Sequence, residues 1–104
     1  MTHNLEIIQV SFPFNFEIES LASQLIAEKL AICIHEFSTI TSFYEWKDVM
    51  ESSKEKLVHI KAKKHHFSTI ENIIMKYHPY DVPEILSIPI GTVSTPYLGW
   101  ANRI

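Results

Sequence analysis

Apolar residues recur with two different spacings along this chain, and each spacing predicts a kind of element. Residues 5–12 are mostly apolar and rich in β-branched side chains, and Pro13 ends the run, which predicts a first strand. An apolar residue then returns every three or four positions over residues 16–30, which predicts a helix. Asn15 is its expected N-cap, with acidic residues in the first turn, where the helix dipole favours them.

The middle of the chain predicts two strands joined by a polar turn. Residues 31–46 are rich in Ile, Thr, Phe and Tyr without proline or glycine, which favours a long strand bent near Ser38 and Thr39. Residues 48–53 are polar and are expected to turn the chain. In residues 58–63 apolar and polar side chains alternate, as in a strand with one dry and one wet face.

A second helix with one apolar face is predicted to end at His78, because the residue before a proline leaves the helical region. Ser68 and Glu71 have the spacing of a capping box near its start. Residues 85–90 then predict a fourth strand.

Two prolines mark the remaining part of the chain. Pro89 cannot donate a ladder hydrogen bond, so it indicates an edge or a bulge in the fourth strand. Thr95 followed by Pro96 is typical of a cap and a first helical residue, which predicts a short terminal helix.

The predicted order is strand, helix, strand, strand, helix, strand, followed by a short C-terminal helix. This βαββαβ order is that of an α+β, ferredoxin-like domain, whose four-stranded antiparallel sheet carries both helices on one face. A chain of 104 residues is expected to form a single domain over residues 1–104. The other sheet face and the strand edges are left uncovered, and oligomerisation commonly covers them.

Composition narrows the class of partner. Twelve acidic against nine basic residues give a net charge of −3, which argues against nucleic acid, because phosphate contacts need a surplus of lysine and arginine. No apolar run approaches the roughly 18 residues of a membrane span, so no membrane partner is expected. The single cysteine, Cys33, cannot form an internal disulfide, and residues 1–4 do not resemble the start of a signal segment. These features predict a cytoplasmic protein.

The connector His78-Pro79-Tyr80-Asp81-Val82-Pro83-Glu84 holds an imidazole, a phenol and two carboxylates between two prolines. Each proline fixes its own φ and keeps the preceding residue extended, so the connector is expected to be stiff. Polar groups held on a stiff segment form either a binding site or an interface.

The chain resembles the CutA proteins, the divalent-cation tolerance family, over about residues 5–101. The matching positions are Ala27-Glu28-Lys29-Leu30-Ala31, Cys33, Thr41-Ser42, Tyr44, Trp46, Lys61, His78-Pro79-Tyr80, Val82-Pro83-Glu84, Pro89, Tyr97-Leu98 and Trp100. The resemblance implies a ferredoxin-like subunit assembled into a tight homotrimer through its strand edges. It also implies an architecture related to PII signalling proteins and a link to copper and other divalent cations.

The sequence departs from the family pattern in its loops and in its metal ligands. Family members usually have Pro-Gly where this chain has Ser38-Thr39, and Gly-Lys where it has Asp48-Val49. The metal ligands described for some members are a cysteine and two histidines, and the corresponding positions here are Val10, Tyr77 and His78. Only His78 can donate strongly, so Cu(II) or another divalent cation is expected to bind only weakly.

The connector residues allow two interpretations. His78, Tyr80 and Glu84 offer nitrogen and oxygen donors to a cation such as Cu(II) or Zn(II), or else they pack at a subunit joint without a ligand. Lys61, on the polar side of its strand, either pairs with Glu84 or an anionic group across such a joint, or is a solvated lysine.

Other candidate residues also have a structural alternative. Cys33 is either a soft copper ligand or a small buried hydrophobe. Large aromatic residues form either a ligand cage or interface packing, and they are Tyr44, Trp46, Tyr97 and Trp100. The remaining histidines do not reproduce a helical two-histidine zinc motif and predict adventitious binding, and they are His3, His35, His59, His65 and His66.

Two classes of function follow. The first is a homotrimeric CutA-like protein implicated in divalent-cation tolerance or response, with a ligand pocket between subunits; its variant is a PII-like sensor or scaffold without a dedicated metal site. The second is an enzyme on the same fold. An acylphosphatase would need an arginine in a glycine-rich loop near the N-terminus, and an RNA-binding sheet would need a glycine and aromatic motif that residues 56–60 lack. A non-enzymatic role is therefore predicted.

Overall fold

A computed structural model describes residues 3–104 of the chain. Met1 and Thr2, two of the four residues used to judge the N-terminus, lie outside the described residues. The elements are β1 (Leu5–Pro13), α1 (Glu19–Ala27), β2 (Ala31–Trp46), β3 (Val49–Lys63), a 3₁₀ turn (Lys64–His66), α2 (Phe67–Tyr77), β4 (Ile85–Pro89) and α3 (Thr95–Ala101). The predicted order of strands and helices is confirmed.

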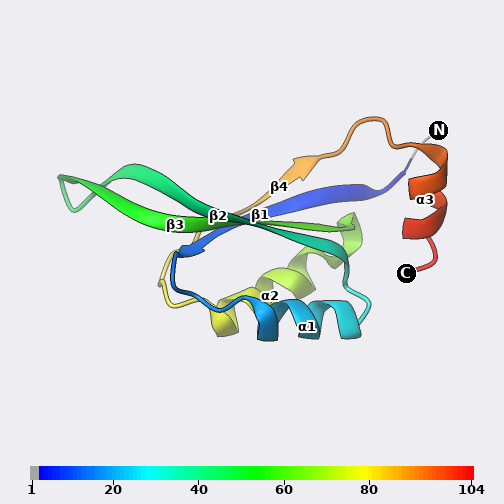
Figure 1. Cartoon of the computed structure of the whole chain (residues 1–104), viewed down its shortest axis with the longest axis horizontal. Coiled ribbons are helices and arrows are strands. Elements are labelled where there is room, and N and C mark those ends of the chain that lie inside the picture. The colour runs from blue at the N-terminus through cyan, green and yellow to red at the C-terminus, as the bar shows by residue number, and fades with distance from the viewer. Residues whose placement is uncertain (1–2) are drawn as a thin grey trace.

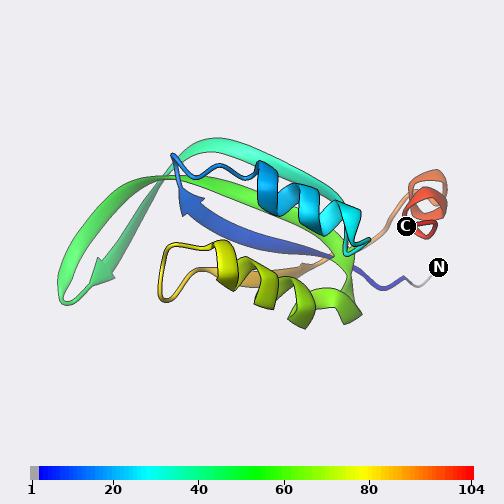
Figure 2. The same cartoon turned by 90° about the horizontal axis from the view of Figure 1, so that it is seen from below.

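The four strands form one antiparallel sheet in the order β2-β3-β1-β4. Helices α1 and α2 lie side by side across one face of this sheet (Figures 1 and 2). The β2–β3 hairpin projects beyond the rest of the sheet at one end, and α3 lies at the opposite end near the start of β1 (Figure 1). The α+β, ferredoxin-like architecture is therefore present, with β2 and β4 as the two edges of the sheet.

The main core lies between the sheet and the two helices because strand side chains alternate between faces. Alternate residues of β1 and β3 point toward the helices and are fully buried, and they are Ile8, Val10, Phe12, Val58, Ile60 and Ala62. Helix α2 contributes Ile70, Ile73 and Ile74 to the same core. A smaller cluster at the other end joins Leu98 and Ala101 of α3 to Leu5 and Ile32.

The β2–β3 hairpin corrects the predicted turn. Trp46 pairs with Val49, so the loop is the two residues Lys47 and Asp48, and β3 already begins where a polar turn over residues 48–53 was expected. Both loop residues have positive φ, 52° and 65°, which is the pattern of a type I′ turn. This segment forms a strand although it is polar. Its side chains lie mostly exposed on a projecting ribbon, where a strand needs no apolar residues.

The predicted bend in β2 is confirmed at Ser38 and Thr39. The pairing register shifts between Phe37 and Ile40, and Thr39 has a φ of 39°. An extra residue in one strand bends it and increases its twist.

The predicted start of the first helix is wrong. The backbone N–H of Phe16 donates to the carbonyl of Pro13, so Asn15 lies inside a turn and the helix begins only at Glu19. Ile18 occupies the N-cap position without a side-chain hydrogen bond.

The other two predicted caps are also displaced. Helix α2 begins after the 3₁₀ turn and has no side-chain cap hydrogen bond, so Ser68 and Glu71 do not form a capping box. At α3 the cap is Ser94, whose hydroxyl accepts from the N–H of Tyr97 at 3.4 Å, one residue before the predicted Thr95. Among residues 3–104 no helix is long and apolar enough to cross a membrane.

Candidate functional site

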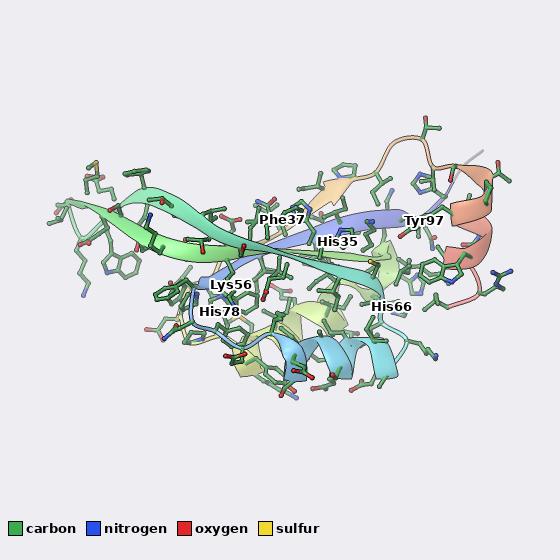
Figure 3. The ribbon with its side chains drawn as sticks, viewed as in Figure 1. His35, Phe37, Lys56, His66, His78 and Tyr97 are labelled. Carbon is green, nitrogen blue, oxygen red and sulfur yellow. The ribbon has the colours of Figure 1, made fainter. Side chains whose placement is uncertain are left out.

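The connector after α2 is anchored by the ring of His78. The last backbone hydrogen bond of the helix runs from the N–H of His78 to the carbonyl of Ile74, and Pro79 then prevents the helix from continuing. The imidazole is buried and stacks on Phe12, with ring centroids 4.6 Å apart. The ring therefore holds the start of the connector against the core side of β1. Figure 3 shows His78 below the sheet.

Both ring nitrogens of His78 are used by the backbone. Nε2 lies 2.7 Å from the carbonyl oxygen of Ser11, which can only accept, so Nε2 donates. Nδ1 accepts from the N–H of Tyr80 at 3.2 Å. These partners define a neutral imidazole with its proton on Nε2. Burial lowers the pKa of His78, while the bond to Ser11 and the nearby Glu55 partly oppose that shift.

Tyr80 is held by an acidic residue that the sequence did not indicate. Its hydroxyl donates to Oε2 of Glu55 at 3.1 Å, and Glu55 is buried. Burial raises the pKa of Tyr80 to about 12, and the adjacent Glu55 carboxyl adds to the shift. Glu55 was missed because only the pairing of β3 with Pro13 of β1 brings it to the connector.

A concavity of about 590 Å³, here called the hairpin hollow, lies between the β2–β3 hairpin and the connector. Two kinds of side chain dominate its lining: carboxylates and aromatic rings. They are Glu51, Glu55, Asp81 and Glu84 together with Phe43, Tyr44, Trp46 and Tyr80. The remaining lining residues are Ser11, Ser42 and Val82, so the described lining carries no basic side chain. This arrangement suits a positively charged group.

Four predicted candidate residues meet in the hairpin hollow: Tyr44, Trp46, Tyr80 and Glu84. Within the chain Glu84 does not contact Lys61. Its Oε2 accepts from Nε2 of Gln9 at 3.0 Å, and Oε1 of Gln9 lies 2.9 Å from Nε2 of His59. Glu84 is thus positioned by a hydrogen-bonded chain on the sheet.

Two other predicted residues meet near α3. The ammonium of Lys61 lies 5.3 Å from the ring centroid of Tyr97, and both line a smaller concavity of about 320 Å³, here called the terminal hollow. The hydroxyl of Tyr97 is buried without a hydrogen-bond partner among the described residues. Trp100 lines neither hollow, although its ring lies 5.6 Å from that of Tyr97 and is 41% exposed.

The positions of the family's metal ligands do not suit a metal ion in this chain. Val10 is buried in the core, the hydroxyl of Tyr77 donates to Oε1 of Gln24 at 2.7 Å, and both nitrogens of His78 are engaged. Over residues 3–104, no group of three or more His, Cys, Asp or Glu side chains is placed to hold a metal. Metal binding at His78 stays a prediction that this geometry does not favour.

Comparison with known proteins assigns the family. The sequence pattern of the CutA1 divalent ion tolerance protein matches residues 6–103. A CutA homolog of Xenopus laevis is 35% identical over 101 residues, which are 97% of this chain and 67% of that protein.

Two solved structures share the fold. The crystal structure of CutA1 from Oryza sativa has a TM-score of 0.90 at 29% identity and covers 98% of this chain and 94% of its own. The periplasmic divalent cation tolerance protein CutA from Archaeoglobus fulgidus has a TM-score of 0.88 at 28% identity, covering 95% and 96%. The order of elements, the sheet and the sequence match therefore agree, and this chain belongs to the CutA1 divalent ion tolerance family.

Proposed function

We propose that this chain acts as a homotrimer in the tolerance of, or response to, divalent cations, with a ligand pocket between neighbouring subunits. The observation that carries the proposal is the projecting β2–β3 hairpin beside the hairpin hollow (Figure 1). Family membership supports the link to divalent cations. The role is binding, not catalysis, and turnover of phosphate esters or acyl phosphates by the purified protein would contradict it.

The surface of the hairpin supports assembly. Phe43, Trp46, Val49 and Met50 lie on the hairpin and are 70%, 53%, 56% and 74% exposed. A projecting ribbon with large exposed apolar side chains is an aggregation hazard unless a partner covers it. The two edge strands, β2 and β4, offer a second surface for pairing between copies.

The two hollows differ in charge, which supports contact between unlike ends of neighbouring subunits. The hairpin hollow is lined by four carboxylates, whereas the terminal hollow contains Lys61 and no acidic residue. Contact of one end with the other is heterologous, and such contacts close into a ring when the rotation fits. The proposed pocket lies where Lys61 of one subunit approaches Glu84 of the next.

Light scattering coupled to size exclusion tests the assembly at micromolar concentration. We expect a mass of about three subunits for the native protein. Met50→Glu places a charge on the hairpin and should reduce the mass, whereas Met75→Glu alters an exposed methionine of α2 and should not. A native monomer would overturn both the trimer and the pocket between subunits.

The alternative within this class is a small-molecule sensor or scaffold without a dedicated metal site. It is favoured by the ring of His78, whose nitrogens are both hydrogen-bonded to the backbone. Calorimetric titration with Cu(II) separates the two: weak heat that is unchanged in His78→Ala supports the sensor. A tight site lost in that variant, with the fold intact by circular dichroism, would make His78 a copper ligand.

A cytoplasmic location is part of the proposal. It is supported by the one cysteine, which can form no internal disulfide. Fractionation of cells that express the chain tests it, and recovery in an extracytoplasmic fraction would contradict it.

A further inference from the structure

A cysteine and two histidines lie together on the sheet face away from α1 and α2. Cys33 and His35 are two residues apart on β2, so their side chains point to the same face. His59 is the direct register partner of His35 on β3. His35 and Phe37 lie on this side in Figure 3, and the ring of Phe37 packs edge-on against both histidines.

The hydrogen bonds of this cluster distinguish the two histidines. Nε2 of His59 donates to the amide oxygen of Gln9, whose own amide is bound to Glu84, so His59 is tied down. His35 is exposed, and among the described residues its only hydrogen-bonding contact is the sulfur of Cys33, with Nε2 3.5 Å from Sγ. Cys33 is half-buried and therefore reachable from solvent.

The distance between sulfur and nitrogen fits two corners of a tetrahedral ion. Zinc binds thiolate sulfur at about 2.3 Å and imidazole nitrogen at about 2.0 Å, so two such ligands lie about 3.5 Å apart across a tetrahedral angle. Sγ of Cys33 and Nε2 of His35 have this separation without any movement. Thiolate and imidazole are also the donors that zinc-like cations prefer to carboxylate and water.

We propose that Cys33 and His35 together bind a thiophilic divalent cation, Zn(II) or Cd(II), with solvent in the remaining coordination positions. The Cys33 thiol releases its proton to solvent as the metal–sulfur bond forms, and no oxidation state changes. The site would give the protein a place to bind a divalent cation, and its biological meaning rests on the proposed function in divalent-cation tolerance or response. It uses none of the residues that line either hollow.

Titration of the reduced native protein with Cd(II) tests the site. We expect one Cd(II) per chain, with an ultraviolet sulfur-to-cadmium charge-transfer band and release of one proton. Cys33→Ser should abolish the band, and Cys33→Ala serves as a second variant if the first folds poorly. His35→Gln should weaken binding by about tenfold or more, because one of two protein donors is lost.

A matched control alters a histidine outside the cluster. His66→Gln, in the 3₁₀ turn before α2, should bind Cd(II) as the native protein does. The proposal is overturned if the native protein shows no band, if His35→Gln binds as tightly as native, or if His66→Gln weakens binding as much as His35→Gln. The mass of each sample by light scattering is a separate readout, so a monomer that still binds Cd(II) contradicts only the trimer.

Discussion

Single residues in the β2–β3 hairpin adopt backbone conformations that glycine usually supplies. Thr39, Lys47 and Asp48 all have positive φ, and the two departures from the family pattern, Ser38-Thr39 and Asp48-Val49, fall on these turns. The free-energy cost of this conformation is highest for a β-branched residue, because its side chain crowds the backbone. The hairpin keeps its bulge and its tight turn despite this local cost.

Thr39→Gly should therefore stabilise the protein. Removal of the strained Cβ is worth about 1–2 kcal/mol, and the greater freedom of glycine in the unfolded chain takes back part of it. The net expectation is a free energy of unfolding higher by about 1 kcal/mol in urea denaturation. Ser38→Gly is the matched control, because Ser38 has no positive φ and should gain nothing. Equal effects of the two changes would show that Thr39 is not strained.

The buried ring of His78 predicts a dependence of stability on pH. Its pKa is lowered in the folded state, so below about pH 6.5 the unfolded chain binds a proton that the folded protein does not. Stability is complete above this value and falls as the pH drops toward the folded-state pKa. Burial also lowers the pKa values of His59 and His66, which act in the same direction.

His78→Asn should lower the free energy of unfolding at pH 7 and flatten its decline between pH 6.5 and pH 5. Urea unfolding at several pH values measures the slope, which Met75→Gln should leave unchanged because this exposed side chain of α2 does not titrate. A slope in His78→Asn as steep as in the native protein would assign the effect to the other two histidines.

At the scale of elements, α3 shows how a terminal helix serves two surfaces. Leu98 and Ala101 bury it against its own sheet, while Trp100 lies outside that cluster and remains partly exposed. The aromatic residues of this helix were expected to form either a ligand cage or interface packing, and the helix is already anchored within its own chain. Trp100 is therefore free to contact a neighbour without carrying the fold of its own subunit.

Trp100→Ala should then destabilise the assembly more than the subunit. A covered tryptophan at an interface commonly costs about 2 kcal/mol or more on truncation, whereas an exposed one costs little. We expect a lower thermal midpoint that falls further on dilution than in the native protein. Leu98→Ala is the contrasting variant, since loss of this buried contact should weaken the subunit itself at every concentration. An unchanged midpoint in Trp100→Ala would place this side chain in solvent.

Element types were more predictable than element ends. The helices and strands follow from apolar spacing, because that spacing records which face is buried. The predicted caps at Asn15, Ser68 and Thr95 were wrong. Several polar residues near each helix start could serve as the cap, and the sequence does not show at which of them the backbone becomes helical.

At the scale of the whole molecule, the two hollows of an elongated subunit differ in charge. The principal extents are 46 × 26 × 23 Å, with the acidic hairpin hollow toward one end and the Lys61 side near α3 at the other. A subunit whose two ends differ in charge suits a ring in which each copy contacts its neighbour head to tail.

A charge exchange tests this arrangement. Lys61→Glu and Glu84→Lys should each lower the mass seen by light scattering, because each places like charges at the proposed joint. The double variant should recover the native mass if the two residues meet across subunits. Within one chain Lys61 lies near Tyr97 and Glu84 is bound to Gln9, so a recovery cannot come from a contact inside the subunit. Failure of the double variant to recover, with both single variants monomeric, would remove this pair from the joint.

The sequence by itself determined the order of elements, the buried faces and the end of the second helix before Pro79, because these depend on local spacing and on the fixed φ of proline. The tertiary structure alone decided which side chains meet. Glu55 reaches Tyr80 only through the pairing of β1 with β3, Glu84 reaches Gln9 only through β1 with β4, and His35 faces His59 only through β2 with β3. Contacts of this kind depend on which strands become neighbours in the sheet and in what register, and strands distant in the sequence are paired only in the folded chain.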